Sequence, residues 1–236
     1  MTAARTWAAA VRARPGPGRL LPLGTAADGA WLAESAAEPV LRRTAQEVRG
    51  VALGRIRIAP ADPDSAGAPA VPPPPAAVPP GPLRIDAECE AAAVEPLPAL
   101  AERLRTALFA AAVERLGLPV TVIDLRVTGL LDAVPEPGGA SSSSEASGAR
   151  AVQPQDEIGR TAVAVPGVAH LTDALGRPVR IDESSARVAC ATSPGHHPVD
   201  VARAVRAAIT PLLASSVPVT IVITAVESRP AGAQMY

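Results

Sequence analysis

Apolar and polar residues follow two different periods in the second half of the chain. Ile158, Ala162 and Val165 lie one helical turn apart, and Asp156 is placed to cap their helix, so this segment predicts a short amphipathic helix. Two segments with period-two alternation come next, followed by a second helical pattern and a run rich in β-branched residues. The predicted helix, strand, strand, helix and strand occupy residues 156–165, 178–182, 186–193, 197–213 and 218–226.

The first half of the chain repeats this order with different spacers. Ser35 and Glu38 have the spacing of a capping box ahead of a helical pattern, and Gly117 is placed to end a long second helix. Segment 83–91 alternates strictly, which predicts a strand with one buried and one solvated face. The predicted elements occupy residues 35–48, 54–59, 83–91, 97–117 and 119–127.

A sequence echo links the two halves. Residues 43–54, RTAQEVRGVALG, reappear as residues 160–171, RTAVAVPGVAHL, with seven identical positions. The proline-rich stretch 61–82 of the first half stands where the second half has only the turn 183–185, and a surface hairpin tolerates such an insertion. A duplicated module with one insertion therefore predicts an α+β fold of two tandem small two-layer modules, each helix-strand-strand-helix-strand, joined by a flexible linker.

Proline, glycine and serine mark the expected boundaries. Prolines favour stiff polyproline II and cannot donate to a strand ladder, and the serine-rich and glycine-rich run is polar and flexible in composition. The predicted organisation is a disordered head 1–28, a first α+β copy 29–133 with the proline-rich insertion 61–82, a Ser/Gly/Pro linker 134–155, a second α+β copy 156–228 and a tail 229–236.

Composition and charge narrow the class of partner. The chain of 236 residues has a net charge of −1 and no lysine, and its arginines are scattered among acids, so nucleic acid is not an expected partner. No uninterrupted apolar stretch reaches bilayer length, and the apolar run near the first residue is too short for a signal peptide, which predicts no direct membrane span. The two cysteines are too few for a disulfide framework, which favours the cytoplasm.

The order of elements and their residues resemble the bacterial alkaline shock protein family, also called the envelope stress response family. The second half carries the resemblance in RTAVAVPGVAHL, PVRID, ARVACA, VDVARAVRAAI and PVTIVITAV. The first half carries it in RTAQEVRGVALG, GRIRIA, LRIDAECEA and PVTVIDLRV, with Arg49 where the second half has Pro166. The resemblance implies two diverged tandem copies of a non-enzymatic cytoplasmic module that associates with itself or with a small membrane-anchored partner at the inner membrane. It supplies no catalytic residue.

Cys190, His196 and His197 are candidate metal ligands in the second half, because thiolate and imidazole bind zinc. Adjacent histidines on a loop usually point apart, and no fourth ligand lies nearby in sequence. Cys190 is on the inward-facing side of its predicted strand. We therefore predict no metal site. A small-ligand or metal-binding accessory protein that uses the Cys190/His196/His197 region is kept as the alternative function.

Two further patterns have structural interpretations. Asp86, Glu88 and Glu90 share the solvated face of one predicted strand, where ordinary carboxylates are poor acid–base catalysts, and Glu95 follows them. Gly50 and Gly167 lack the following lysine of a phosphate loop and are expected to be helix C-caps. Together with the family resemblance, which implies the stress-response role, these patterns predict a non-enzymatic interaction or scaffold protein with no catalytic residue, cofactor or metal.

Overall fold

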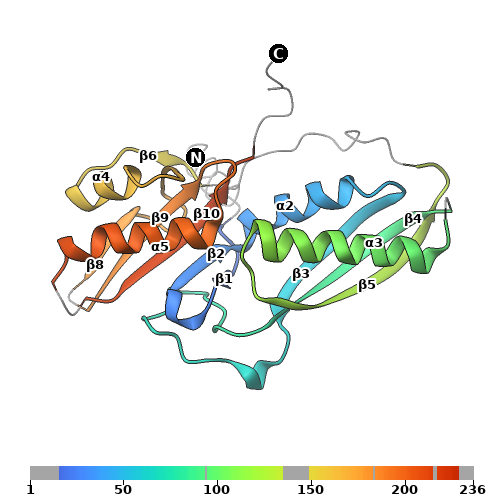
Figure 1. Cartoon of the computed structure of the whole chain (residues 1–236), viewed down its shortest axis with the longest axis horizontal. Coiled ribbons are helices and arrows are strands. Elements are labelled where there is room, and N and C mark those ends of the chain that lie inside the picture. Colours follow the sequence, from blue (N-terminus) through green and yellow to red (C-terminus); the bar gives the residue numbers. More distant parts are fainter. Residues whose placement is uncertain (1–15, 94, 135–148, 183, 215–216, 229–236) are drawn as a thin grey trace, which may run out of the picture.

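The computed structural model describes residues 16–93, 95–134, 149–182, 184–214 and 217–228. Over these residues the chain forms a mixed α+β fold with four α-helices and two sheets, so the predicted α+β class is confirmed (Figure 1). The helices are α2 (Glu34–Gln46), α3 (Leu97–Ala110), α4 (Glu157–Val163) and α5 (Pro198–Ile209).

The first half supplies a three-stranded sheet, in which β3 (Val51–Pro60) pairs antiparallel with β4 (Leu83–Ala92) and β4 pairs parallel with β5 (Val120–Leu131). Alternation in β4 has the predicted effect, because Ile85, Ala87 and Cys89 are buried while the acidic residues between them are less so. Helices α2 and α3 cover one face of this sheet (Figure 1). The other face carries charged side chains.

The second half forms most of a seven-stranded sheet. Along one path the strand order is β1-β2-β10-β9-β7-β6, and β8 pairs with the free part of the β9 edge. Strands β9 and β10 are parallel and buried along most of their length, which agrees with the apolar run predicted for the last strand. The strand bounds are β1 (Leu20–Leu23), β2 (Ala30–Ala33), β6 (Ala151–Val152), β7 (Val168–Thr172), β8 (Val179–Asp182), β9 (Ser185–Thr192) and β10 (Val219–Val226).

The same backbone hydrogen bonds recur in the two halves. The N–H of Leu83 donates to Pro119 O over 2.9 Å, and the N–H of Ala186 donates to Pro218 O over 2.9 Å. At the other end of the same strands, the Gly50 carbonyl accepts from Ala92 and the Gly167 carbonyl accepts from Ser193, each over 2.8 Å. Strands at corresponding places in the two halves are therefore held to their neighbours at corresponding points.

Both recurring glycines have a left-handed backbone, with φ of 87° at Gly50 and 93° at Gly167. They do not cap the helices directly, because the C-caps are Glu47 and Ala164 and each glycine lies three residues further on. The glycine instead turns the chain from the helix into the next strand. The expected helix C-caps are therefore corrected to turn glycines.

Strand β7 was not predicted. In the first half one long strand, β3, lines the whole edge of β4, whereas in the second half β7 and β8 share the same edge of β9. The turn around Gly176, whose φ is 87°, separates these two short strands. Five residues of mixed polarity next to a helix carry too little alternation to be recognised from sequence.

The N-terminal segment corrects the expectation of a disordered head, of which residues 1–15 lie outside the described part. Strand β1 and the 3-10 turn Ala26–Asp28 form within residues 20–28, and β1 pairs antiparallel with β2. Strand β2 then pairs in parallel with β10 of the second half. The first half therefore contributes two buried strands to the sheet of the second half, and one continuous core contains residues of both.

The proline-rich insertion 61–82 contains no strand in the described structure, as expected, but it is attached to the fold. Val78 is buried, its N–H donates to Leu20 O over 2.8 Å, and its carbonyl accepts from the indole of Trp31 over 3.3 Å. Of the predicted linker, residues 135–148 lie outside the described part, and Ala151–Val152 form β6 against β7. The predicted tail 229–236 also lies outside it.

Two local predictions had different outcomes. The side chain of Asp156 accepts a hydrogen bond from Gly159 N over 2.6 Å at the start of α4, so that cap is confirmed. The capping box of Ser35 and Glu38 is wrong, because α2 begins one residue before Ser35, with Ala33 as its N-cap. Strand β2 runs directly into α2 and leaves no room for a separate cap.

Candidate interaction surface on α3 and β5

Most sheet edges of the described structure are short or covered. The outer edge of β1 is covered by residues 76–78, and β6 has only two residues. Along β3, Arg42 donates to the carbonyls of Leu53 and Gly54, over 3.3 and 2.8 Å, and Arg19 donates to Ile58. Occupied carbonyls and charged side chains make an edge a poor template for another strand.

The outer edge of β5 is protected only in part. Arg105 of α3 donates from Nε to the carbonyl of Ile123 over 3.3 Å. Beyond Ile123 the strand continues to Leu131, and in the described structure no strand lies on its outer side. An edge strand of this length with few charges is a site at which a further strand can add.

Exposed apolar side chains concentrate on the same two elements. Of the eight large hydrophobic side chains that are exposed in the described residues, six lie on α3, its continuation and β5. These six are Leu97, Phe109, Val113, Val122, Val127 and Leu130. Large apolar side chains gathered on adjacent elements mark an interaction site more often than single ones do. Val122 is level with Arg84 of β4 and therefore lies on the face of the sheet opposite α3, so the six side chains flank the β5 edge on both sides. We call these residues and the outer edge of β5 the α3–β5 surface.

An open apolar pocket of about 500 Å³ lies at one end of this surface, where the proline-rich insertion meets the start of β5. Phe109 and Val113 line it together with Pro80, Pro82 and Pro119. None of the residues that line it is ionisable. The pocket can receive an apolar side chain, but its lining offers no ionisable acid or base.

A second open pocket of about 600 Å³ lies along the end of α5 and contains Arg203 and Arg206. Both arginines form hydrogen bonds within the fold. Arg206 donates to the carbonyls of Ala27 and Val219 over 3.1 and 2.9 Å, and Arg203 donates to the carboxylate of Asp28 over 2.7 Å. Their charges hold the N-terminal hairpin against α5.

The histidines of the alternative site lie against different parts of the fold. The His197 ring nitrogen Nε2 is 3.5 Å from the carbonyl oxygen of Val113, where the α3 segment ends against the start of α5 (Figure 1). The His196 ring lies so close to Gly167 that a Cβ there would be 2.8 Å from the His196 Cδ2 atom. Neighbouring histidines that pack against different parts of the fold do not converge on one ion.

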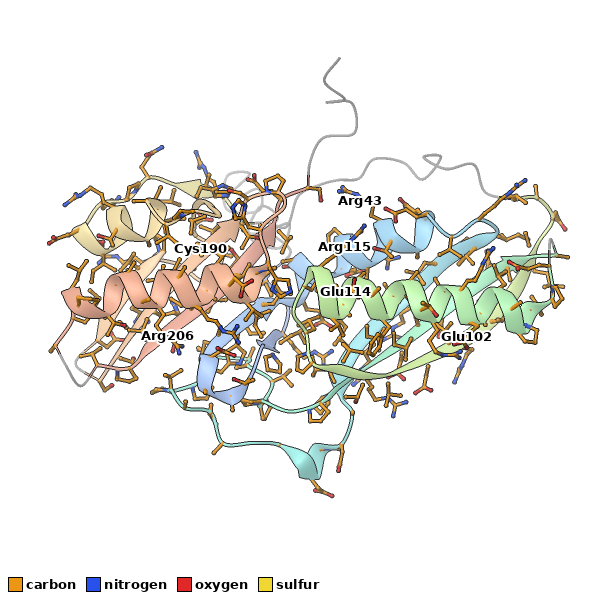
Figure 2. The ribbon with its side chains drawn as sticks, in the orientation of Figure 1. Arg43, Glu102, Glu114, Arg115, Cys190 and Arg206 are labelled. Carbon is orange, nitrogen blue, oxygen red and sulfur yellow. The ribbon has the colours of Figure 1, made fainter. Side chains whose placement is uncertain are left out.

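Cys190 is fully buried in β9, in the half of the molecule that holds α4 and α5 (Figure 2). Burial raises the pKa of its thiol to about 12, because the thiolate would lose its hydration. Among the described residues, no group of three or more His, Cys, Asp or Glu side chains is placed to hold a metal ion. The structure therefore does not bring Cys190, His196 and His197 together as a site.

The acidic residues of β4 lie on the uncovered face of the three-stranded sheet. Arg84 donates to Asp86 over 2.9 Å and also to Asp124 of β5, so this face is a network of opposite charges. Glu88 and Glu90 continue the same row, which is the solvated face that the alternation predicts. Glu95 forms an ion pair with Arg103 over 2.8 Å and lies apart from them. No pair of carboxylates converges on a pocket here.

The α3–β5 surface was not predicted from the sequence. One signal was present, since Phe109 is the single phenylalanine of the chain and lies off the helical stripe of Leu100, Leu104 and Leu108. The exposure of Val127 and Leu130 has no comparable signal, because it depends on β5 being an edge strand.

No protein-family model, curated protein or solved structure matches this chain. None of the described helices has the length and apolar composition needed to cross a bilayer.

Proposed function

We propose that the protein is a non-enzymatic interaction module of the envelope or alkaline stress response, which binds a protein partner through the α3–β5 surface. The observation that supports this most directly is the concentration of six exposed large apolar side chains on two adjacent elements. The chemistry of the surface fits binding rather than catalysis, since the pocket beside Phe109 is lined by apolar and small residues without ionisable groups.

We also infer that the chain arose by duplication of one helix-strand-strand-helix-strand module. The hydrogen bonds Leu83 to Pro119 and Ala186 to Pro218 support this inference, together with the recurring glycine turns and the echo of residues 43–54 in 160–171. In each half two helices contact the strands of a sheet, α2 and α3 in the first half and α4 and α5 in the second. The inferred modules are not independent, because β1 and β2 join the second sheet.

The partner is proposed to be either a small membrane-anchored protein or a second copy of the chain. We place the protein in the cytoplasm, at the inner membrane when such a partner anchors it. A membrane protein could insert an apolar segment between Phe109 and the prolines of the insertion, and a strand could add to β5. Both modes use the same surface.

Affinity capture of the tagged full chain from its native cell tests this proposal, with each captured protein then purified and titrated against the pure chain. We compare a double variant, Phe109→Ser combined with Val113→Ser, with a matched control. The control combines Ile181→Ser with Leu212→Ser and so removes two exposed apolar side chains elsewhere. We expect a membrane-anchored protein to bind the wild type and the control, and to lose at least about tenfold in affinity for the Phe109/Val113 variant. Equal binding by the two variants, or the recovery of no direct binder together with no self-association, would overturn the proposal.

A further inference from the structure

We propose that two copies of the chain associate through β5, strand against strand in antiparallel orientation, about a two-fold axis at Leu125. This inference rests on the proposed interaction function and names a second copy as an occupant of the surface. A two-fold axis is the usual symmetry of self-association, because the same patch then serves both copies.

The regular part of β5 is limited to a short stretch. The register with β4 shifts between Leu83 and Arg84 and again between Cys89 and Glu90, which leaves Val122–Val127 as an uninterrupted strand. Within this stretch Ile123, Leu125 and Val127 are level with the inward residues of β4, and Asp124 and Arg126 are level with the outward ones. A second strand added here extends both faces of the sheet.

Charge selects one register for the added strand. Directly opposite residues in an antiparallel pair share a face, so only every second shift keeps the buried face buried. With Leu125 on the axis, Asp124 faces Arg126 of the second copy, and the pair occurs twice. The two neighbouring registers that keep the faces matched have their axis at Asp124 or at Arg126. They place Asp124 opposite Asp124 of the second copy, or Arg126 opposite Arg126, and like charges directly opposite are destabilising.

The charged side chains of β5 are already placed for this pairing in the single chain. Arg126 is exposed and forms no ion pair within the described residues, whereas Asp124 is already bonded to Arg84. Association would therefore extend a network on the open face from Arg84 through Asp124 to Arg126 of the second copy. On the other face Ile123 would lie opposite Val127, which is 40% exposed in the single chain.

Arg105 opposes this association, since it occupies the carbonyl of Ile123 in the single chain. An incoming strand must share or displace that hydrogen bond. We therefore expect a concentration-dependent dimer instead of a permanent one.

Sedimentation equilibrium of the purified full chain, with two charge variants, tests the inference. In Arg126→Asp the opposing residues are acidic in both copies, and in Asp124→Arg they are basic in both copies. We expect the wild type to dimerise, each variant alone to dimerise at least about tenfold more weakly, and an equimolar mixture of the two variants to recover association. Circular dichroism checks that each variant is folded. This control matters most for Asp124→Arg, because the new arginine lies next to Arg84, which bonds Asp124 in the wild type.

The register is tested separately by disulfide formation. Only the proposed register places residue 125 opposite itself, so Leu125→Cys is expected to crosslink between copies, whereas Val122→Cys, which faces residue 128, is expected not to. The native Cys89 and Cys190 are buried and give a low background. Crosslinking at residue 122 but not at residue 125 would overturn the proposed register.

Failure of this inference is distinguishable from failure of the proposed function. A wild-type chain that stays monomeric at all concentrations, or an equimolar mixture that stays monomeric, would overturn the β5 dimer. Neither result affects the binding of a membrane-anchored protein beside Phe109 and Val113, which is measured with a different pair of variants.

Discussion

Asp28 and Arg203 form a bidentate ion pair between the N-terminal hairpin and α5. Arg203 Nε lies 2.7 Å from Asp28 Oδ1, and Arg203 Nη2 lies 3.1 Å from Asp28 Oδ2. The same carboxylate accepts hydrogen bonds from the backbone and hydroxyl of Thr25, over 2.7 and 2.8 Å. Only 11% of the Asp28 side chain is exposed, whereas 53% of the Arg203 side chain is, so the contact is half-buried, with the carboxylate on its buried side.

Asp28→Asn is expected to lower the free energy of unfolding by about 1–3 kcal/mol, because it removes the carboxylate that accepts two hydrogen bonds from Arg203 and leaves that arginine only the more distant Asp200, at 3.6 Å. Asp182→Asn is the matched control, since it breaks an ion pair with Arg180 whose side chains are 60% and 49% exposed. Exposed pairs contribute about 0–1 kcal/mol. Urea denaturation of the three proteins at neutral pH measures the difference, and equal losses in both variants would contradict the assignment.

The contribution of Asp28 should depend on pH in one direction. The hydrogen bonds from Arg203 hold the pKa of the Asp28 carboxyl well below its ordinary range, against the opposing effect of burial. A carboxyl with a depressed folded pKa stabilises the protein fully above its unfolded pKa of about 3.9, and the stabilisation is lost as the pH falls toward the folded pKa. The gap in stability between wild type and Asp28→Asn should therefore shrink between pH 6 and pH 3. A gap that widens on acidification would show that another group is responsible.

The native thiols should resist labelling. Cys190 is fully buried with a pKa of about 12, and burial also raises the pKa of Cys89. Thiolate is the reacting species, so a disulfide reagent at pH 8 should label neither cysteine in the folded protein on the timescale of minutes, and both in urea. Rapid labelling of one thiol per native chain would contradict the burial of that cysteine.

Gly167 is expected to tolerate alanine less well than Gly176 does. Both have a left-handed backbone, but a Cβ at Gly167 would lie 2.7 Å from Val201 Cγ2, whereas nothing lies within 4 Å of one at Gly176. Gly176→Ala should cost about 1–2 kcal/mol from backbone strain alone. Gly167→Ala should cost about 1–3 kcal/mol more, because the core around α5 must also shift. The shift of the urea midpoint in each variant measures both costs.

Arg105→Ala should strengthen self-association, the opposite of the effect of Arg126→Asp. Removal of the side chain frees the Ile123 carbonyl for an incoming strand. Arg103→Ala is the control on the same helix, because Arg103 pairs with Glu95 and the Arg49 carbonyl, away from the β5 edge. Sedimentation equilibrium should show a dissociation constant several-fold lower for Arg105→Ala than for the control. A weaker dimer in Arg105→Ala would show that Arg105 supports association.

Elements with strong local periodicity were predicted closely. Segment 83–91 became β4 (Leu83–Ala92), segment 218–226 became β10 (Val219–Val226), and the helical pattern from Leu97 became α3 with a π-helical turn at Ala111–Arg115. The predicted helix 197–213 became α5 (Pro198–Ile209), which ends two residues before Pro211. Each of these patterns is long enough for its period to be unambiguous.

Elements that depend on distant partners were missed. Strands β1 and β2 have four residues each and are apolar on both faces, so they show no alternation that would distinguish them from a loop. They are strands because β10 is available to pair with β2. The candidate surface was missed for the same kind of reason, since Val127 and Leu130 would be core residues if another strand lay beside β5.

The sequence by itself determined the α+β class, the periods of the longer helices and strands, and the echo between the halves, because these properties reside in the order of side chains along a short segment. Only the tertiary structure decided that the N-terminal hairpin completes the second sheet, that His196 and His197 pack in different directions, and that β5 is left at an edge. Those outcomes depend on which segments compete for the same hydrogen bonds and the same apolar faces, and pairing between residues far apart in the chain leaves no period in the sequence.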